Sequence, residues 1–185
     1  MELPYHNPPH IYLDETVYII SASTINKLHF FDSAWKKKLL FEHVNSVLNK
    51  FGWHLFAWVI LDNHYHLLLR TEKDNQLGKF INLIHGGSSY QLNKIENKQR
   101  RKTWFNYWDT CVRNEKTFWT RFNYIHNNPV KHGYVDSPEK YEFSSYNDYL
   151  QKYGRDWLTD VWLKYPVIDF IKGEIKEPEG SIPVW

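Results

Sequence analysis

The chain has 185 residues, a formal net charge of +2 and 18% aromatic residues, so it is the size of one ordinary domain and can bury a substantial core. Its single cysteine, Cys111, excludes an internal disulfide and a cysteine-rich zinc site. No segment approaches the ~20 apolar residues that span a bilayer and the N-terminus has no apolar signal core, so we expect a soluble, cytoplasmic protein.

The N-terminal half predicts a strand, a helix and two further strands. Residues 1–15 contain three prolines and are interpreted as an irregular arm. The β-branched segment 16–23 predicts a strand, and helically spaced apolar residues predict a helix that ends at Gly52. Residues 53–61 and 64–70 then predict two strands, joined by the Asp62–Asn63 turn.

The C-terminal half predicts two longer helices separated by a strand. The first helix covers about 74–96, with a weak point at "GGSSY". A short strand is expected at 107–113, and Asn114 then caps a helix that ends at Pro129. A turn-rich connector, a short capped helix in "SSYNDYLQKYG" and a tail to Trp185 complete the chain.

This order of elements, β-α-β-β-α-β followed by helices, is typical of an α+β fold. We expect a ferredoxin-like split βαβ arrangement, with an antiparallel sheet, helices on one face and a C-terminal helical extension. Residues 1–150 are predicted to form the main domain with its N-terminal arm. Residues 151–185 are predicted to be a tail that packs on this domain or extends it.

Two histidines are one residue apart in "LDNHYHLLLR". Side chains alternate along a strand, so His64 and His66 are expected on one face, with Tyr65 on the other. Two imidazoles on one face can bind a single divalent ion, but a metal needs at least one further ligand. One buried and one partly exposed structural histidine would give the same pattern.

The predicted helix after Asn114 offers further candidates. Tyr124 and Asn128 are four residues apart, so they project from one side of the helix, with Arg121 beside them. They flank the expected apolar stripe and can point into a cleft between helix and sheet. Both residues also have a structural explanation: Tyr124 as a half-buried packing residue with a solvated hydroxyl, and Asn128 as part of a helix end that asparagine side chains stabilise.

The segments "NHYHLLL", "RNEKTFWTRFNYIHNNPVKHGYV" and "YEFSSY" resemble a known family. The chain is similar over about 12–150 to the REP-associated tyrosine transposases, relatives of the single-tyrosine HUH transposases of small insertion sequences. The residue between the histidines, Tyr65, departs from the bulky apolar residue that is usual there. The region of Gly86 and Gly87 and the tail after residue 150 match less clearly.

The resemblance implies an activity and a set of roles. His64 and His66 would be the paired metal ligands, Asn128 the third ligand and Tyr124 the nucleophile. The expected cofactor is Mg²⁺ or Mn²⁺, with Mn²⁺ the better match to two nitrogen ligands. The chain would act as an endonuclease and strand transferase on single-stranded or hairpin DNA, through a 5′-phosphotyrosine intermediate.

Basic and aromatic residues suggest how DNA would be bound. Arg113 and Arg121 are candidates to hold flanking phosphates. A second group interleaves positive charge with rings, as single-strand binding surfaces do; its members are Lys98, Arg100, Arg101, Lys102 and Trp104. Solvated helix faces and ordinary surface ion pairs are the structural alternatives for all of them.

Two other functions remain open from the sequence. One is a DNA-binding module that descends from a transposase and no longer cleaves. The other is a metallohydrolase in which a carboxylate, Asp62 or Asp109, completes the histidine site. The sequence leaves open the DNA recognised, whether the protein is still mobile or domesticated, and whether it is a monomer or a homodimer in which Tyr124 meets a partner's histidines.

Overall fold

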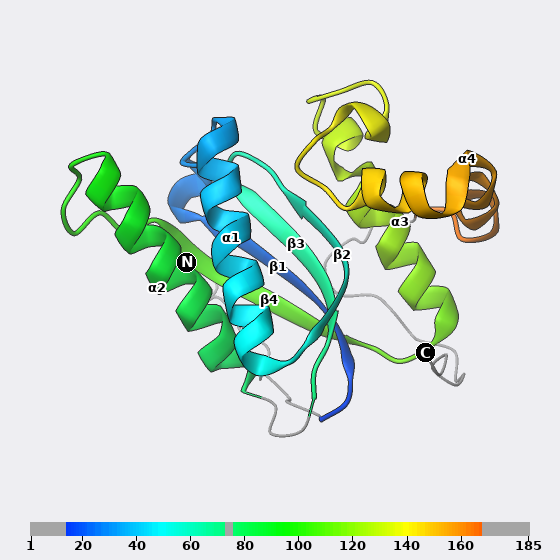
Figure 1. Cartoon of the computed structure of the whole chain (residues 1–185), viewed down its shortest axis with the longest axis horizontal. Helices are drawn as coiled ribbons and strands as arrows, with labels where there is room; N and C mark the ends of the chain where they lie inside the picture. Colours follow the sequence, from blue (N-terminus) through cyan, green and yellow to red (C-terminus); the bar gives the residue numbers. More distant parts are fainter. Residues whose placement is uncertain (1–13, 73–75, 168–185) are drawn as a thin grey trace, which may run out of the picture.

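The computed structural model describes residues 14–72 and 76–167 (Figure 1). The predicted N-terminal arm lies almost wholly outside this part, as does the end of the C-terminal tail. The elements are β1 (Val17–Thr24), η1 (Ile25–Lys27), α1 (Ala34–Phe51), β2 (His54–Ile60), β3 (His64–Arg70), α2 (Leu77–Ile95), β4 (Trp104–Val112), α3 (Glu115–Lys131), η2 (Pro138–Lys140) and α4 (Tyr146–Lys164).

The strands form a four-stranded sheet in the order β2-β3-β1-β4. Every neighbouring pair is antiparallel, so the two central strands are β3 and β1. The crossovers through α1 and α2 give the predicted ferredoxin-like split βαβ arrangement, which is therefore confirmed. The register across the centre pairs Ser21 with His66 and Ser23 with His64, which places these four residues at one end of the sheet.

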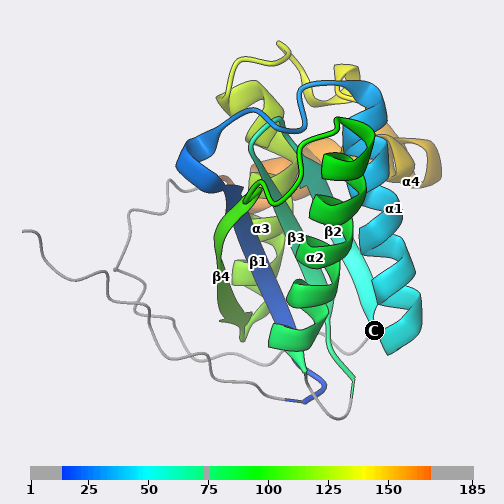
Figure 2. The ribbon, with the colours of Figure 1, turned by 90° about the vertical axis from the view of Figure 1, so that its left-hand side faces the viewer.

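The sheet buries both of its faces (Figures 1 and 2). On one face, Ile20, Tyr65 and Leu67 belong to the core that α1 and α2 cover. On the other, Ile19 and Leu68 belong to a second core, which contains three apolar residues of α3: Phe118, Phe122 and Ile125. The prediction placed the helices on one face of the sheet. This holds for α1 and α2, whereas α3 and α4 lie on the opposite face. In line with this two-sided cover, β3 is buried at every position between its two end residues, His64 and Arg70.

The predicted end of a helix at Pro129 is wrong. The helix α3 passes through Pro129 and ends with Lys131. Proline lacks an N–H, so one i→i−4 hydrogen bond is missing at Pro129, two residues before the end of α3. The helix α2 runs through Gly86 and Gly87, as predicted, and Gly87 lies so close to α1 that a Cβ atom there would be 2.8 Å from Nδ1 of His43.

Two boundaries also differ from the prediction. β4 begins at Trp104 rather than at 107, because its pairing with β1 continues through a register shift to Thr24. α4 extends to Lys164, with a break at Gly154, where φ is +83°. It therefore crosses the predicted division at residue 150, and Leu158 is buried in the same core as α3.

None of the helices in the described part of the chain combines the length and the apolar character that crossing a bilayer requires.

Candidate functional site

His64 and His66 lie on the same face of β3, as the alternation predicts. Their ring centroids are 5.3 Å apart. His66 is buried and His64 is half-buried, on the side of the sheet that α3 covers. The intervening Tyr65 is fully buried on the opposite face, where its hydroxyl lies 3.0 Å from Nε2 of His85. The bulky ring between the histidines therefore serves the core and does not enter the site.

Each histidine is held through its Nδ1 atom. Nδ1 of His66 lies 2.7 Å from Oγ of Ser21, the residue paired with it on β1. Nδ1 of His64 lies 2.6 Å from Oδ1 of Asn63. Side-chain partners of this kind fix the orientation of metal-binding imidazoles and leave Nε2 to face a ligand. Ser21 and Asn63 had not been identified from the sequence, although Asn63 directly precedes the histidine pair.

The helix α3 brings Tyr124 and Asn128 to the histidines. Its start is fixed by Asn114, whose side chain accepts a hydrogen bond of 2.8 Å from the backbone N–H of Thr117. Its apolar stripe packs on the sheet, so the flank next to that stripe faces β3. The ring of Tyr124 lies 5.2 Å from that of His66, and Oδ1 of Asn128 lies 3.1 Å from Nε2 of His64. Four of the predicted site residues therefore meet within one chain.

The site keeps its imidazoles neutral. Burial lowers the pKa of His64 to about 4; the contact with Asn128 opposes this shift, whereas His132 and the charge of Lys27 add to it. Burial also lowers the pKa of His66 well below its ordinary value, with contributions from His64, His132, Arg121 and Lys131. A neutral imidazole retains the lone pair that a metal needs. At neutral pH both histidines are thus in the form that can act as a ligand.

Two further residues reach the site from the end of α3. The ring of His132 lies 4.9 Å from that of His64, and Nζ of Lys131 lies 5.7 Å from the centre of the Tyr124 ring. Both occur in the "NNPVKHG" segment. His132 is four residues after Asn128, so the same helical spacing that links Tyr124 and Asn128 could have predicted it, had the helix not been ended at Pro129.

The donor set fits a divalent ion. Nε2 of His64 and Oδ1 of Asn128 are 3.1 Å apart, and two adjacent donors of an octahedral ion with bonds of about 2.1 Å lie about 3 Å apart. Asn128 is fully buried, and its Nδ2 has no hydrogen-bond partner in the described structure. In residues 14–72 and 76–167 no group of three or more His, Cys, Asp or Glu side chains could hold a metal.

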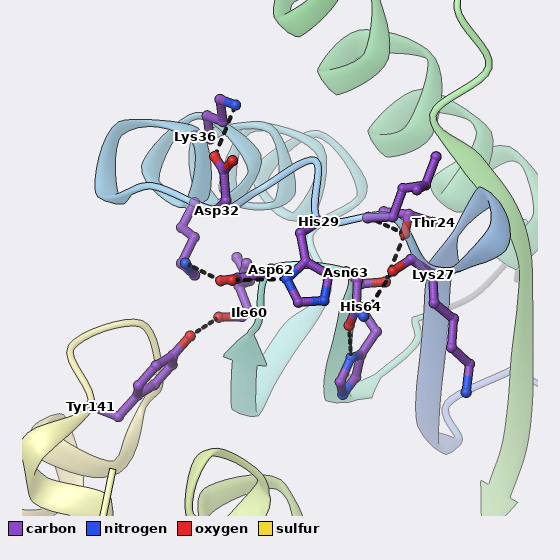
Figure 3. Close-up of polar contacts among 12 residues, drawn as sticks. Thr24, Lys27, His29, Asp32, Lys36, Ile60, Asp62, Asn63, His64 and Tyr141 are labelled. Carbon is purple, nitrogen blue, oxygen red and sulfur yellow. Dashed lines mark hydrogen bonds and ion pairs between the residues drawn. The ribbon is translucent and has the colours of Figure 1, made fainter. Parts of the chain in front are cut away.

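The two carboxylates considered as alternatives are directed elsewhere. Oδ1 of Asp62 lies 2.6 Å from Nζ of the buried Lys37, and Oδ2 lies 3.4 Å from Nδ1 of His29 (Figure 3). Asp109 is paired with Ile20, whose side chain lies in the core beneath α1 and α2, so it takes the face opposite the histidine pair. Neither carboxylate completes the histidine site in this structure.

The predicted DNA-binding residues divide into accessible and structural ones. Lys98, Arg100, Lys102 and Arg113 are exposed, whereas Arg121 is buried beside the site. Arg101 donates to Glu96 at 2.5 Å and to Asn93 at 2.8 Å. Trp104 is 6% exposed and stacks on His85, so it offers no free ring face for a base.

The exposed basic residues before β4 lie at the same end of the sheet as His64. The backbone N–H of Ile25, just after β1, donates to the carbonyl of Thr103 at 2.9 Å. The neighbouring Thr24 donates its own N–H to the carbonyl of Asn63, also at 2.9 Å. The loop that carries Lys98, Arg100 and Lys102 therefore joins the sheet close to the turn that precedes the histidine pair.

Comparison with known proteins agrees with this arrangement. The family model described as "Transposase IS200 like" matches residues 15–128. A Haemophilus influenzae protein described as a REP-associated tyrosine transposase is 32% identical over 131 residues, which cover 64% of this chain and 71% of that protein. The REP-associated tyrosine transposase of Escherichia coli is 29% identical over 121 residues, which cover 64% of this chain and 67% of that protein.

A solved structure gives the same fold. The REP-associated tyrosine transposase bound to a REP hairpin superposes with a TM-score of 0.66 at 19% identity, covering 97% of this chain and 99% of that one. The family match includes both histidines, Tyr124 and Asn128. The chain belongs to the IS200-like transposase family, and within that family it is similar to the REP-associated tyrosine transposases.

Proposed function

We propose that the chain is a metal-dependent endonuclease and strand transferase that acts on hairpin-forming single-stranded DNA through Tyr124. The observation that carries the proposal is the convergence of Tyr124 and Asn128 from α3 with His64 and His66 from β3. Membership of a transposase family supports a DNA-processing enzyme. The similar fold of a transposase bound to a REP hairpin supports hairpin DNA as the substrate class.

The proposed metal is Mg²⁺ or Mn²⁺, held by His64, His66 and Asn128. The buried amide and the two neutral imidazoles supply three uncharged donors, a set that Mn²⁺ accepts more readily than Mg²⁺ because two of them are nitrogens. The bound ion would polarise the scissile phosphate and stabilise the charge that develops on its oxygens. Ser21 and Asn63 orient the two rings from behind, through their Nδ1 atoms.

In the proposed cleavage step, the hydroxyl oxygen of Tyr124 attacks the scissile phosphorus. A phosphotyrosyl bond forms to the 5′-phosphate of the downstream fragment, and the bond between that phosphorus and the 3′ oxygen of the upstream fragment is broken. The proton lost from the tyrosine hydroxyl is balanced by the proton gained by the new 3′-hydroxyl. One phosphoester bond replaces another, so a second 3′-hydroxyl can reverse the step and complete strand transfer without ATP.

Positive charge near Tyr124 favours this chemistry. A tyrosine hydroxyl is largely neutral at cellular pH and needs a neighbouring cation or base to become an effective nucleophile. Nζ of Lys131 lies 5.7 Å from the Tyr124 ring, and Arg121 is close enough to His66 to influence its pKa. We propose that Arg121 and Arg113 hold phosphates near the cleavage point, and that Lys98, Arg100 and Lys102 contact the strand further along.

The proposal predicts a covalent protein–DNA adduct. Labelled single strands tiled from the DNA that flanks the protein's own gene would be incubated with the protein in Mn²⁺ or in chelator, and resolved on a denaturing gel. The adduct should form only with metal and should be lost in Tyr124→Phe. The matched control is Tyr153→Phe, which alters an exposed tyrosine of α4. Adducts that survive in Tyr124→Phe would refute the assignment of the nucleophile.

Metal-dependent DNA binding without any adduct would instead identify a non-cleaving module.

A metallohydrolase is disfavoured by the positions of Asp62 and Asp109, because Asp62 is paired with Lys37 and Asp109 faces away from the histidines. Its specific expectation is that Asp62→Asn or Asp109→Asn weakens metal binding. We propose that Tyr124 acts together with the histidines of its own chain, because the rings of Tyr124 and His66 lie 5.2 Å apart.

A further inference from the structure

Both ring nitrogens of His64 face a side-chain oxygen. Nδ1 lies 2.6 Å from Oδ1 of Asn63, and Nε2 lies 3.1 Å from Oδ1 of Asn128. A neutral imidazole carries a single N–H, so it can donate to only one of these oxygens. The nitrogen that keeps its proton cannot bind a metal, and the other nitrogen presents a lone pair. Asn63 and Asn128 therefore compete for the one proton of His64.

The orientation of the Asn63 amide is fixed by a second bond. Its Nδ2 donates to the backbone carbonyl of Lys27 at 3.0 Å, so its oxygen must face His64 (Figure 3). A reversed amide would lose this bond and place a donor against the histidine. By contrast, Nδ2 of Asn128 has no hydrogen-bond partner in the described structure, so no hydrogen bond of that nitrogen fixes the orientation of the amide.

The peptide segment that holds Asn63 is itself constrained. The carbonyl of Asn63 accepts a hydrogen bond of 2.9 Å from the backbone N–H of Thr24. The carbonyl of Lys27 is presented by a short turn in which Asn26 and Lys27 have φ values of +50° and +53°. Residues other than glycine adopt this conformation at a cost, and they keep it where the surroundings enforce it. The turn after β1 is thus shaped to receive the Asn63 amide.

We infer that Asn63 is a positioning residue that keeps the proton of His64 on Nδ1 and so leaves the lone pair of Nε2 directed at Asn128. The shorter contact and the fixed amide favour Asn63 over Asn128 in the competition. With Nδ1 protonated, Nε2 and Oδ1 of Asn128 are two acceptors that face each other across 3.1 Å. Two acceptor lone pairs at this distance repel each other, and a cation between them would bind both atoms as ligands.

The same argument separates the two histidines. Nδ1 of His66 contacts Oγ of Ser21, and a hydroxyl can either donate or accept a hydrogen bond. Ser21 therefore holds the ring of His66 but does not choose its tautomer, whereas Asn63 does both for His64. Removing Asn63 should allow the proton to move to Nε2, where the oxygen of Asn128 accepts it and the metal-binding lone pair is lost.

The direct test is the tautomer of His64 in the metal-free protein. Long-range ¹H–¹⁵N correlation spectra of histidine-labelled full chain would be recorded at about pH 8, above the ordinary histidine pKa of about 6.5. His64→Gln identifies the His64 resonances. The wild type should show a protonated Nδ1 and an unprotonated Nε2. A protonated Nε2 in the wild type would overturn the inference, and this reading needs no variant of Asn63 to fold.

Three variants then test the cause. Asn63→Ala should shift the proton towards Nε2, while Asn63→Asp retains an acceptor oxygen and should keep Nδ1 protonated. The control is Asn147→Ala, which also removes an amide bonded to a backbone carbonyl, that of Glu139, but lies remote from the histidines. An unchanged tautomer in a folded Asn63→Ala variant would contradict the role of Asn63.

The consequence for metal binding rests on the proposed function. Calorimetric titration with Mn²⁺ should show affinity reduced about 10–100-fold in Asn63→Ala and little changed in Asn147→Ala. Equal affinity in Asn63→Ala and wild type would overturn the inferred link between tautomer and ligand. If the wild type has the expected tautomer but binds no Mn²⁺ and forms no adduct, the proposed function fails while the proton-holding role of Asn63 stands.

Discussion

Oδ1 of Asn128 lies 3.1 Å from Nε2 of His64, across a sequence separation of 64 residues. This contact joins the helix that carries Tyr124 to the strand that carries the histidine pair. It is made by a fully buried amide, whose placement depends on the packing of α3 against the sheet. The candidate site is therefore a product of the fold, because neither β3 nor α3 contains all of its groups.

The effect of replacing Asn128 on metal affinity should depend on whether the new side chain keeps a donor oxygen. Asn128→Ala removes one of three protein donors, so we expect Mn²⁺ affinity to fall about tenfold or more, whereas Asn128→Asp keeps an oxygen, adds a negative charge and should bind Mn²⁺ at least as tightly as the wild type. Isothermal titration of the metal-free protein measures both. Asn127→Ala, at the half-buried neighbouring position, is the control. Wild-type affinity in Asn128→Ala would remove this residue from the site.

Neutralising Lys131 should slow adduct formation without weakening the metal site. Its ammonium lies 5.7 Å from the Tyr124 ring, where a positive charge stabilises both a developing tyrosinate and the phosphate. For an exposed, partly screened charge we expect a roughly tenfold lower rate in Lys131→Gln, partial or full recovery in Lys131→Arg, and a smaller effect at high salt. Lys116→Gln, at an exposed position in the first turn of α3, is the control. A rate that is independent of Lys131 and of salt would exclude this electrostatic role.

Two adjacent glycines of α2 should respond to alanine in opposite directions. At Gly86 a Cβ atom meets no described atom within 4 Å, so Gly86→Ala should stabilise the helix by about 0.5–1 kcal/mol. At Gly87 the Cβ atom would lie 2.8 Å from Nδ1 of His43, whose Nε2 contacts Oε1 of Gln91. The displaced ring should make Gly87→Ala less stable than Gly86→Ala by about 1–2 kcal/mol. Urea unfolding measures the difference, and equal stabilities would contradict the close approach of α1 and α2.

Acid should destabilise the fold through His85. Its ring stacks on Trp104 at 4.4 Å and lies against the hydroxyl of Tyr65, and burial lowers its pKa to about 3. In the unfolded chain His85 takes up a proton near pH 6.5, whereas in the folded chain it stays neutral until the pH approaches 3. The contribution of His85 to the free energy of unfolding is therefore complete above pH 6.5 and declines by about 1.4 kcal/mol per pH unit between these two values. Urea unfolding across this range gives the slope of the unfolding free energy against pH. In His85→Gln this slope should correspond to the uptake of about one proton fewer on unfolding than in the wild type. An unchanged pH dependence in a folded His85→Gln variant would contradict this role of His85.

The sheet and the helix that carry the site were predictable because their patterns are local. Alternation along β3 predicted the common face of His64 and His66, and the four-residue spacing predicted the common side of Tyr124 and Asn128. The order of elements predicted the ferredoxin-like sheet. The catalytic and metal-binding roles came from the family resemblance and not from these patterns.

Other features depend on contacts between distant segments and could not be predicted in the same way. Pro129 was expected to end α3, and the extension to Lys131 brings Lys131 and His132 to the site. Trp104 has the composition of a stacking residue, but its ring is buried against His85 and Phe31. The role of Asn63 requires the carbonyl of Lys27, which the turn after β1 presents.

The most direct measurement identifies the residue to which the DNA is covalently bonded after cleavage. The adduct formed in Mn²⁺ would be digested with nuclease and then with trypsin, and the peptides would be weighed by mass spectrometry. Cleavage after Arg121 and Lys131 releases the peptide FNYIHNNPVK, in which Tyr124 is the only tyrosine. A nucleotide attached to this peptide through phosphate is the result that the proposed function predicts. A covalent adduct whose nucleotide lies on any other peptide would contradict it.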